Sequence, residues 1–431
     1  MTENLLQFIW QHRLYSNSEA LQTTDGSSLI VQHPGTLNTH AGPDFSEAKI
    51  KIEQTLWVGN VELHIKSSDW NKHAHQKNEN YEKLILHVVY ENDDEIETKN
   101  NTLFPTLELK KYIDTSLLKK YEYLMEHAGF IPCEKNILDV KSIVVQLQME
   151  RMLAERLEEK TSHIIELLKK YNNNWQEVFY VQLAMGFGLH INQYAFEQLA
   201  LNTPISLLAK HKNNALQIEA LLFGQAGFLN DYFDEVYPTL LQTEYQYVKK
   251  LHSLENIEKK HWKFLRLRPA NFPTIRIAQF AQLILDSTHL FSKILHAKSI
   301  KEIEQLFKIN VSDYWLTHYT FNEKSLERKK SLGKSFVQTL IINSIVPTLF
   351  IYGKLQAKDE YCKRAILFLE QLPAESNSII TQWQALNIEI KNAAHTQAFI
   401  QLYKRYCTEK KCLQCSIGYS ILRKNEQDFI H

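Results

Sequence analysis

The sequence lacks an uninterrupted apolar run long enough to cross a membrane. The longest candidate, Thr339 to Tyr352, contains Asn343, Ser344 and Pro347, whereas a spanning helix needs about 20 predominantly apolar residues. The first residues offer neither a basic start nor the apolar core of a signal peptide. These absences favour a cytoplasmic protein over a membrane or secreted one.

Cysteine is scarce and odd in number, with five residues in a chain of 431. Disulfide frameworks are typical of short secreted chains with an even cysteine count, so a reducing compartment is expected. The sequence also has no glycine-rich phosphate loop, no nucleophile elbow and no dinucleotide fingerprint. Because no fixed-period repeat is evident, a solenoid is not expected either.

What is present is an ordinary globular composition, with 44% hydrophobic and 23% charged residues over a length that suits two or three domains. The formal net charge is zero, yet residues 1–115 contain 10 basic and 17 acidic side chains, and the remainder 39 and 32. An acidic small domain beside a mildly basic body suits a carboxylate-lined site next to a surface that tolerates polyanions. A chance split explains the same numbers.

Hydrophobic periodicity divides the chain into two parts. Up to about residue 115, two runs with period-two alternation and three other short runs predict strands, with a helix at the N-terminus and a short helix before the fourth strand. From about residue 135, apolar residues recur at steps of three and four, which is typical of helices. The expected strands are 29–32, 45–53, 56–66, 83–90 and 107–109, and the expected helices are 4–15, a short one within 67–82, 140–171, 175–201, 205–228, 238–254, 273–296, 334–353, 359–371 and 395–406.

The predicted fold class is therefore α+β, with a mixed sheet and flanking helices followed by a large all-helical region. The expected domains are residues 1–115 as an α/β domain, 116–139 as a linker, and 140–431 as a helical domain that ends in a cysteine cluster.

A polar constellation lies on the predicted 45–53 and 56–66 strands. Asp44 opens the first strand, and Glu62, His64 and Lys66 occupy alternate positions of the second, so these three share one face. Two carboxylates on adjacent strands are suited to hold Mg²⁺ or Mn²⁺, which activates water in phosphodiester hydrolysis. We interpret Asp44, Glu62, His64 and Lys66 as candidate catalytic residues, with Asp44 and Glu62 as metal ligands. The alternative is a solvated polar face on an amphipathic hairpin.

Histidines form a second constellation, because His64, His73 and His75 fall within twelve residues. Imidazoles near a carboxylate are suited to bind Zn²⁺ or Mn²⁺. Surface or hydrogen-bonded histidines are the alternative in a chain that has 18 of them.

A third constellation is the C-x4-C-x2-C spacing of Cys407, Cys412 and Cys415, which is one ligand short of a tetrahedral thiolate site. Cys133, in the segment between the two parts, is the expected fourth ligand. Zn²⁺ and a [4Fe–4S] cluster both suit four thiolates. The alternative is a set of reduced thiols with Cys407 packed in a helix, and Cys362 is expected in a helix core.

The fourth constellation is a group of arginines around a proline-rich segment. Arg266, Arg268 and Arg276 are candidates to bind a nucleic-acid phosphate near the helix that Pro273 is expected to begin and Asn271 to cap. Internal ion pairs between helices are the alternative role for these side chains.

Several sequence blocks identify the chain as a member of an uncharacterised bacterial family, domain of unknown function 2851. They are AGPDFSEAKI, WVGNVELHIKSSDW, HAHQKNENY, LILHVVYE, QIEALLFGQAGFL, RPANFPTIRIAQ and YCTEKKCLQCSIG. The resemblance covers nearly the whole chain and implies no activity.

A more distant resemblance, limited to residues 1 to about 115, is to the PD-(D/E)XK nuclease superfamily. It depends on the order of elements, on Pro43-Asp44 at the start of one strand and on Glu62 within the next. It implies a restriction-endonuclease-like sheet and metal-dependent cleavage of nucleic acid. Those nucleases usually carry lysine where this chain has His64, and Lys66 or Lys49 is the candidate replacement.

Two functions therefore remain open from the sequence. One is a divalent-metal-dependent nuclease that acts on DNA or RNA. The other is a noncatalytic helical adaptor whose nuclease-like domain only binds nucleic acid or protein.

Overall fold

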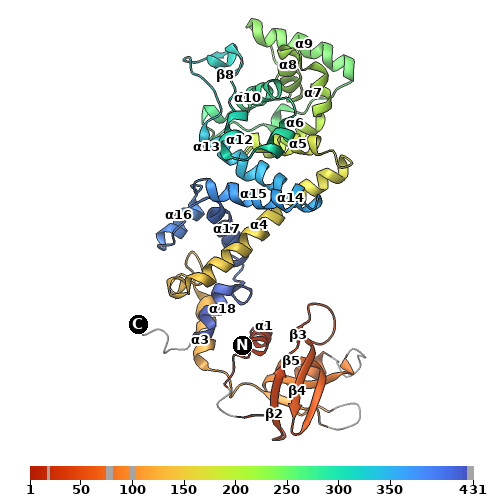
Figure 1. The fold of residues 1–431 in the computed structure, drawn as a ribbon, viewed down its shortest axis with the longest axis vertical. Coiled ribbons are helices and arrows are strands. Elements are labelled where there is room, and N and C mark those ends of the chain that lie inside the picture. The colour runs from red at the N-terminus through yellow and green to blue at the C-terminus, as the bar shows by residue number, and fades with distance from the viewer. Residues whose placement is uncertain (17–19, 74–80, 98–102, 425–431) are drawn as a thin grey trace. The chain divides into compact units, whose positions relative to one another are not determined.

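The computed structural model describes residues 1–16, 20–73, 81–97 and 103–424. Its contacts divide the chain into two units, Met1–Gln148 together with Leu402–His431, and Met149–Gln401. The mixed α/β beginning and the large helical region that follows are as expected from the sequence (Figure 1). The unit boundaries differ from the expected domains, because the segment with the C-terminal cysteines belongs to the N-terminal unit.

The first unit contains a seven-stranded mixed sheet with the order β1-β2-β4-β5-β6-β7, in which β3 pairs with β4. The pairs from β1 to β5 are antiparallel, and β6 pairs parallel with both β5 and β7. The strands are β1 Leu21–Gln22, β2 Ser28–His33, β3 Thr36–Leu37, β4 Phe45–Ile52, β5 Thr55–Lys66, β6 Leu84–Glu91 and β7 Thr106–Glu108. All five strands expected from the sequence are present within a few residues of their predicted bounds.

The β4–β5 hairpin is the central feature of this sheet. Residues 53 and 54 form its turn and connect the paired residues Ile52 and Thr55. A bulge near the start of β4 places Glu47 at a φ of 58°. The first half of β5 is exposed, whereas the four residues 61–64 are all buried. Alternation of an inner and an outer face does not hold at residues 61–64, where both faces lose contact with water, and Trp57 in the first half is 49% exposed.

Four helices complete the first unit: α1 Glu3–His12, α2 Asp69–Lys72, α3 Thr115–Glu126 and α18 Ser416–Arg423. The Oγ1 atom of Thr2 accepts from the Leu5 amide and caps α1, which buries five apolar residues. Helix α3 occupies the segment expected to be a linker. Asp114 caps it by accepting from the Ser116 amide at 2.8 Å, and Leu117 and Leu124 are buried on its inner side.

The second unit is helical, as predicted. Its helices are α4 Ser142–Lys170, α5 Trp175–Phe187, α6 Gln193–Asn202, α7 Ile205–His211, α8 Ala215–Gln225, α9 Val236–His252, α10 Pro273–Asp286, α11 Leu290–His296, α12 Ile300–Leu306, α13 Lys334–Leu340, α14 Val346–Leu355, α15 Asp359–Gln371, α16 Ser378–Ala385 and α17 Ala393–Leu402. A short hairpin of β8 His318–Thr320 and β9 Glu323–Lys324 is an element that the sequence pattern did not predict.

Three helices that were predicted as continuous are each two helices in the structure. Leu189 at a φ of 52° separates α5 from α6, and His289 at a φ of 54° separates α10 from α11. Between α7 and α8, Asn214 caps the second helix by accepting from the Gln217 amide at 3.3 Å. Apolar spacing continued across these breaks because both helices of each pair pack into the same core, so periodicity alone did not locate them.

The segment Lys334–Leu355 is continuously helical, as the expected helix 334–353 predicts. Helix α13 continues into α14 through the π-helical turn Ile341–Ile345, which lies just before Pro347. A π turn shifts the backbone hydrogen bonds next to a proline, which lets the helix continue. Among the described residues this is one helix long and apolar enough to cross a membrane, and 78% of its apolar window is buried inside the protein. A core helix has the same properties.

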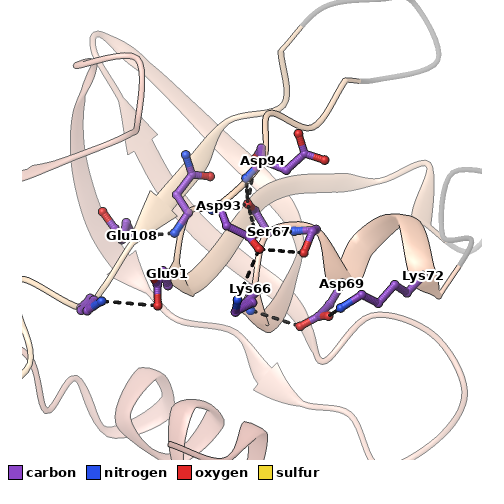
Figure 2. A network of polar contacts seen from close by, with 11 residues as sticks. Lys66, Ser67, Asp69, Lys72, Glu91, Asp93, Asp94 and Glu108 are labelled. Carbon is purple, nitrogen blue, oxygen red and sulfur yellow. Dashed lines mark hydrogen bonds and ion pairs between the residues drawn. The ribbon is translucent and has the colours of Figure 1, made fainter.

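A polar network joins the ends of β5 and β6 in the first unit (Figure 2). The buried Ser67 Oγ accepts from the amides of Asp93 and Asp94 at 3.0 and 2.8 Å and donates to the Asp94 carbonyl at 2.7 Å. The Asp93 carboxylate accepts from the backbone amide and hydroxyl of Ser68, both at 3.0 Å, and these bonds lower the pKa of Asp93 to about 2. The Lys66 Nζ atom lies 3.7 Å from Asp93 Oδ2. Lys66 therefore takes part in this network.

We expect Ser67→Ala to lower the free energy of unfolding by about 1–3 kcal/mol, because it removes the acceptor of two backbone amides and the donor to the Asp94 carbonyl, all in partly buried hydrogen bonds. Ser68→Ala is the matched control. It removes one exposed hydroxyl from Asp93 and should cost less than about 1 kcal/mol. Urea unfolding, together with hydrogen exchange of the β5 and β6 amides, measures both. Equal costs for the two variants would contradict this account of the network.

Candidate functional site

Asp44 and Glu62, the two carboxylates predicted from the sequence, lie together in the first unit. Asp44 Oδ2 accepts from the Leu63 amide at 2.9 Å, and Glu62 Oε2 accepts from the Asp44 amide at 3.0 Å. Each carboxylate thus accepts a hydrogen bond from a backbone amide at or next to the other residue. Gln7 of α1 donates from Nε2 to Asp44 Oδ1 at 2.8 Å, which connects the helix to the pair. Asp44 is half-buried, and Glu62 is only 5% exposed.

Burial raises the pKa of both carboxyl groups, and the charge of Asp44 raises that of Glu62 further. Burial is the largest cause of the rise in the pKa of Asp44 to about 6, and the negative charge of Glu3 adds to it, while the Leu63 amide and Gln7 oppose it. Burial also raises the pKa of Glu62 to about 8, with the Asp44 charge as the second cause. Two carboxylates forced together in this way are favourable sites for a divalent cation, which replaces the repulsion with attraction.

Three further side chains belong to this site and were missed by the sequence interpretation. Glu3 and Gln7 lie four residues apart on α1, a spacing that puts both on one face of the helix. Burial raises the pKa of Tyr81 to about 12, with the charges of Glu62 and Asp44 as the next causes, so its hydroxyl lies near the pair. The i, i+4 spacing of Glu3 and Gln7 was a usable signal, whereas nothing in the sequence pointed to Tyr81.

Histidines extend from Glu62 into the interior. His64 Nε2 lies 3.8 Å from Glu62 Oε1 and 3.3 Å from His73 Nδ1, while His64 Nδ1 lies 2.8 Å from His87 Nε2. His64 and His87 are 1% and 0% exposed, and the Trp70 ring packs against both. Buried imidazoles at these separations share protons, since one nitrogen of each close pair must donate and the other accept.

The register of β5 and β6 explains this histidine cluster, because Glu62 pairs with His87 across the two parallel strands. The sequence interpretation missed His87, which lies in a run that predicted only a buried strand. His73 is the predicted histidine that reaches His64, and His75 lies outside the described residues.

The two lysines considered as replacements for a catalytic cation lie elsewhere. Lys66 is half-exposed and its ammonium group faces Asp93 in the network of Figure 2. Lys49 of β4 is exposed and pairs in register with Val58. The buried group nearest to Glu62 along β5 on the same face is therefore His64.

The arginines predicted to contact nucleic acid have different environments in the second unit. Arg276 is 6% exposed, donates to Gln279 Oε1 and Asn271 Oδ1, and stacks over the Phe336 ring at 3.4 Å. It therefore has the internal role, and a phosphate contact by this side chain is not supported. Asn271 binds Arg276 instead of capping α10, although Pro273 does begin that helix as predicted. Arg266 and Arg268 are exposed.

The four cysteines of the predicted thiolate site lie close together in the first unit. Cys133, Cys407, Cys412 and Cys415 all line one cavity of about 20 Å³. None of the five cysteines is in a disulfide, and Cys362 lies apart in α15, where its thiol donates to the Phe350 carbonyl. Within the described residues, no group of three or more His, Cys, Asp or Glu side chains is placed so that it could hold a metal ion as it stands.

We expect the acidic pair to make stability depend on pH. The raised pKa of Glu62 means that the folded protein favours the neutral carboxyl, whereas a glutamate in the unfolded chain ionises near pH 4.3. The free energy of unfolding should therefore decrease as the pH rises from about 4.5 through about 8, on the order of 3 kcal/mol in the absence of divalent ions. Glu62→Gln should remove most of this dependence and be the more stable protein at pH 8.5.

Unfolding with urea in a chelating buffer at pH 5, 7 and 8.5 measures this dependence, with hydrogen exchange of the β4 and β5 amides as the local readout. Glu47→Gln is the matched control, because Glu47 is an exposed glutamate of β4 and should leave the pH profile unchanged. If the free energy of unfolding of Glu62→Gln and of the unmodified protein changed with pH in the same way, ionisation of Glu62 would not be the cause of the pH dependence.

Comparisons with known proteins agree with the sequence blocks described above. The sequence profile of a family described as protein of unknown function (DUF2851) matches residues 3–378. Searches of curated proteins and of solved structures return no match. Since the profile covers most of the 431 residues, the chain belongs to the DUF2851 family of proteins of unknown function.

Proposed function

We propose that Asp44 and Glu62 hold a divalent cation, Mg²⁺ or Mn²⁺, and that the first unit hydrolyses phosphodiester bonds of DNA or RNA. The observation that carries the proposal is the pair itself: two carboxylates fixed side by side by reciprocal backbone hydrogen bonds, each with a raised pKa. Such an arrangement is unfavourable without a cation and favourable with one. A bound ion would activate water and stabilise the leaving oxygen.

The topology around the pair supports the same proposal. Helix α1 precedes three antiparallel strands, β2, β4 and β5, and α2 then leads to β6, which is parallel to β5. This is the order of helix and strands in the PD-(D/E)XK nucleases that the sequence resembles. Asp44 at the start of β4 and Glu62 within β5 also correspond to the acidic positions of that superfamily.

His64 takes the position of the usual lysine and has two properties that suit the attacking water. Its Nε2 atom lies 3.8 Å from Glu62 Oε1, so a water bound to the same cation would be near the imidazole. Its other nitrogen contacts His87, which gives the abstracted proton a second buried imidazole to share it. We infer that His64 orients and deprotonates the water, with His87 as a positioning residue.

Metal binding gives the first test of this function. Manganese titrated into the unmodified protein should bind at the acidic pair, and Glu62→Gln should weaken that binding at least about 10-fold, because one anionic ligand is lost. Glu47→Gln should bind as the unmodified protein does. Calorimetric titration in a chelator-free buffer at pH 7.5 is the measurement. Equal Mn²⁺ affinity in Glu62→Gln and the unmodified protein would exclude the pair as the ion's site.

Cleavage gives the second test, with single- and double-stranded DNA and RNA as substrates in Mn²⁺ or Mg²⁺. We expect Glu62→Gln to abolish cleavage and His64→Gln to reduce it roughly 100-fold. His64→Lys should keep or raise the rate, because it restores the lysine of the resembled superfamily. Activity should also fall towards acid pH, since protonation of Asp44 and Glu62 releases the ion. If neither the unmodified protein nor His64→Lys cleaves any of these substrates, the nuclease proposal fails.

A noncatalytic binding function remains the second candidate, and one observation favours it. The exposed face of the β2–β4–β5 sheet presents Ile30, Leu56 and Val58, which are 58%, 51% and 61% exposed, with Lys49 and Lys51 of β4 between them in register. Apolar side chains grouped in this way are typical of a contact surface. Under this alternative the first unit binds a protein or nucleic acid through that face, and Arg266 and Arg268 remain candidate phosphate contacts of the second unit.

A further inference from the structure

We propose that Cys133, Cys407, Cys412 and Cys415 form a mononuclear zinc site that fastens the C-terminal segment to the turn after α3. The four side chains come from two segments about 270 residues apart in sequence and line one cavity in the first unit. Cys133, Cys412 and Cys415 are buried, and Cys407 is partly buried. Four thiols that line one small space from distant segments supply the number and kind of ligands that a structural zinc site requires.

The backbone around the cysteines is shaped to present them. Cys412 begins a 3₁₀ turn in which the Cys415 amide donates to the Cys412 carbonyl, and Lys410 precedes it at a φ of 50°. A Cβ atom at Gly418 would lie 2.2 Å from the Cys412 carbonyl oxygen, so glycine is needed where α18 passes the turn. Cys407 ends the π-helical turn Tyr403–Cys407, an irregularity that occurs frequently at functional sites.

The size of the cavity distinguishes the two kinds of metal centre that four thiolates can hold. A volume of about 20 Å³ has room for one water-sized particle. A single zinc ion fits such a space, because Zn–S bonds of about 2.3 Å place tetrahedral sulfur atoms about 3.8 Å apart. A cluster of four irons and four sulfides needs far more room than one particle occupies. The geometry therefore favours one zinc ion.

The charges around the cavity fit four thiolates and a cation. Burial and the neighbouring cysteines raise the pKa of Cys133 and Cys407 far above the usual thiol value and that of Cys412 to about 12, while Lys410 lowers the last. The Lys411 side chain also lines the cavity, and its positive charge suits the net negative charge of a zinc tetrathiolate. Without metal the thiols are neutral, so zinc binding must displace their protons.

Among the described residues no three of these side chains are placed to hold a metal ion, so the sulfur atoms do not stand at ligand distance from a common point. Rotation about χ1 moves only the sulfur atom of a cysteine and passes between well-populated staggered positions. Since all four cysteines already border the same cavity, zinc needs side-chain rotation and no rearrangement of the fold.

The test is metal binding by the full-length, reduced protein. We expect one zinc per chain by elemental analysis, and Co²⁺ added to the apoprotein should give the thiolate-to-cobalt charge-transfer absorption of a tetrahedral site. Cys133→Ser and Cys412→Ser should weaken zinc binding at least about 100-fold and lose that absorption. Cys362→Ser is the matched control, because Cys362 lies outside the cavity, and it should bind zinc as the unmodified protein does.

Two further measurements decide between the outcomes. Glu62→Gln should retain the zinc and the cobalt absorption, which separates this site from the acidic pair. Circular dichroism of the Cys133→Ser protein checks that it is folded, and if it is not, the cobalt absorption of the unmodified protein is the deciding result. Protein that is folded and reduced but takes up neither Zn²⁺ nor Co²⁺ through thiolates would overturn the proposal. Iron with inorganic sulfide in place of zinc would overturn the mononuclear site.

Discussion

The candidate site depends on one constraint: Asp44 and Glu62 are each held by a backbone amide next to the other. The Leu63 amide donates to Asp44, and the Asp44 amide donates to Glu62, so neither carboxylate can move away from its neighbour without breaking a hydrogen bond. The start of β4 and the middle of β5 are fixed together by the same two bonds. Repulsion between the two groups is consequently built into the folded backbone and does not relax by rotation of a side chain.

This constraint gives the surrounding residues their roles. Gln7 stabilises the ionised form of Asp44 from α1, whereas Glu3 on the same helix opposes it. His64 and His87 continue the polar interior from Glu62 across β5 and β6. A bound divalent cation turns the repulsion between these carboxylates into a stabilising interaction, and this physical argument leads to the metal-dependent function that we propose.

The cysteine cavity, like the carboxylate pair, brings together buried groups whose ionised form needs a cation to be stable. Its thiols are neutral because burial disfavours the thiolate, and proximity to one another raises their pKa further. A soft cation stabilises the thiolates in that place, as a hard cation does for the carboxylates. The two sites differ in their consequence, since the carboxylate pair lies within one sheet, whereas the cysteines connect residues 133 and 407–415 of the chain.

Much of the fold follows from local patterns. Period-two alternation located β4 and β5, a nearly continuous apolar run located β6, and the change to helical spacing located the second unit, because each pattern reflects which sides of an element lose contact with water. Where both sides of a strand are covered, as at residues 61–64, alternation does not reveal that the second side is buried. Where two helices share one core, as α5 and α6 do, apolar spacing does not reveal the break between them. The helix at Thr115–Glu126 was missed because its segment was expected to be a linker, although the helix buries Leu117 and Leu124.

The sequence by itself determined the family, the mixed sheet, and the pairing of Asp44 with Glu62, since a strand and its hairpin partner fix which residues meet. It also indicated the cysteine triplet through its spacing. Only the tertiary structure placed His87 against His64, directed Lys66 to Asp93, and buried Arg276 beside Phe336. Those contacts join elements that are distant in sequence, so their partners depend on how the chain packs and not on any local periodicity.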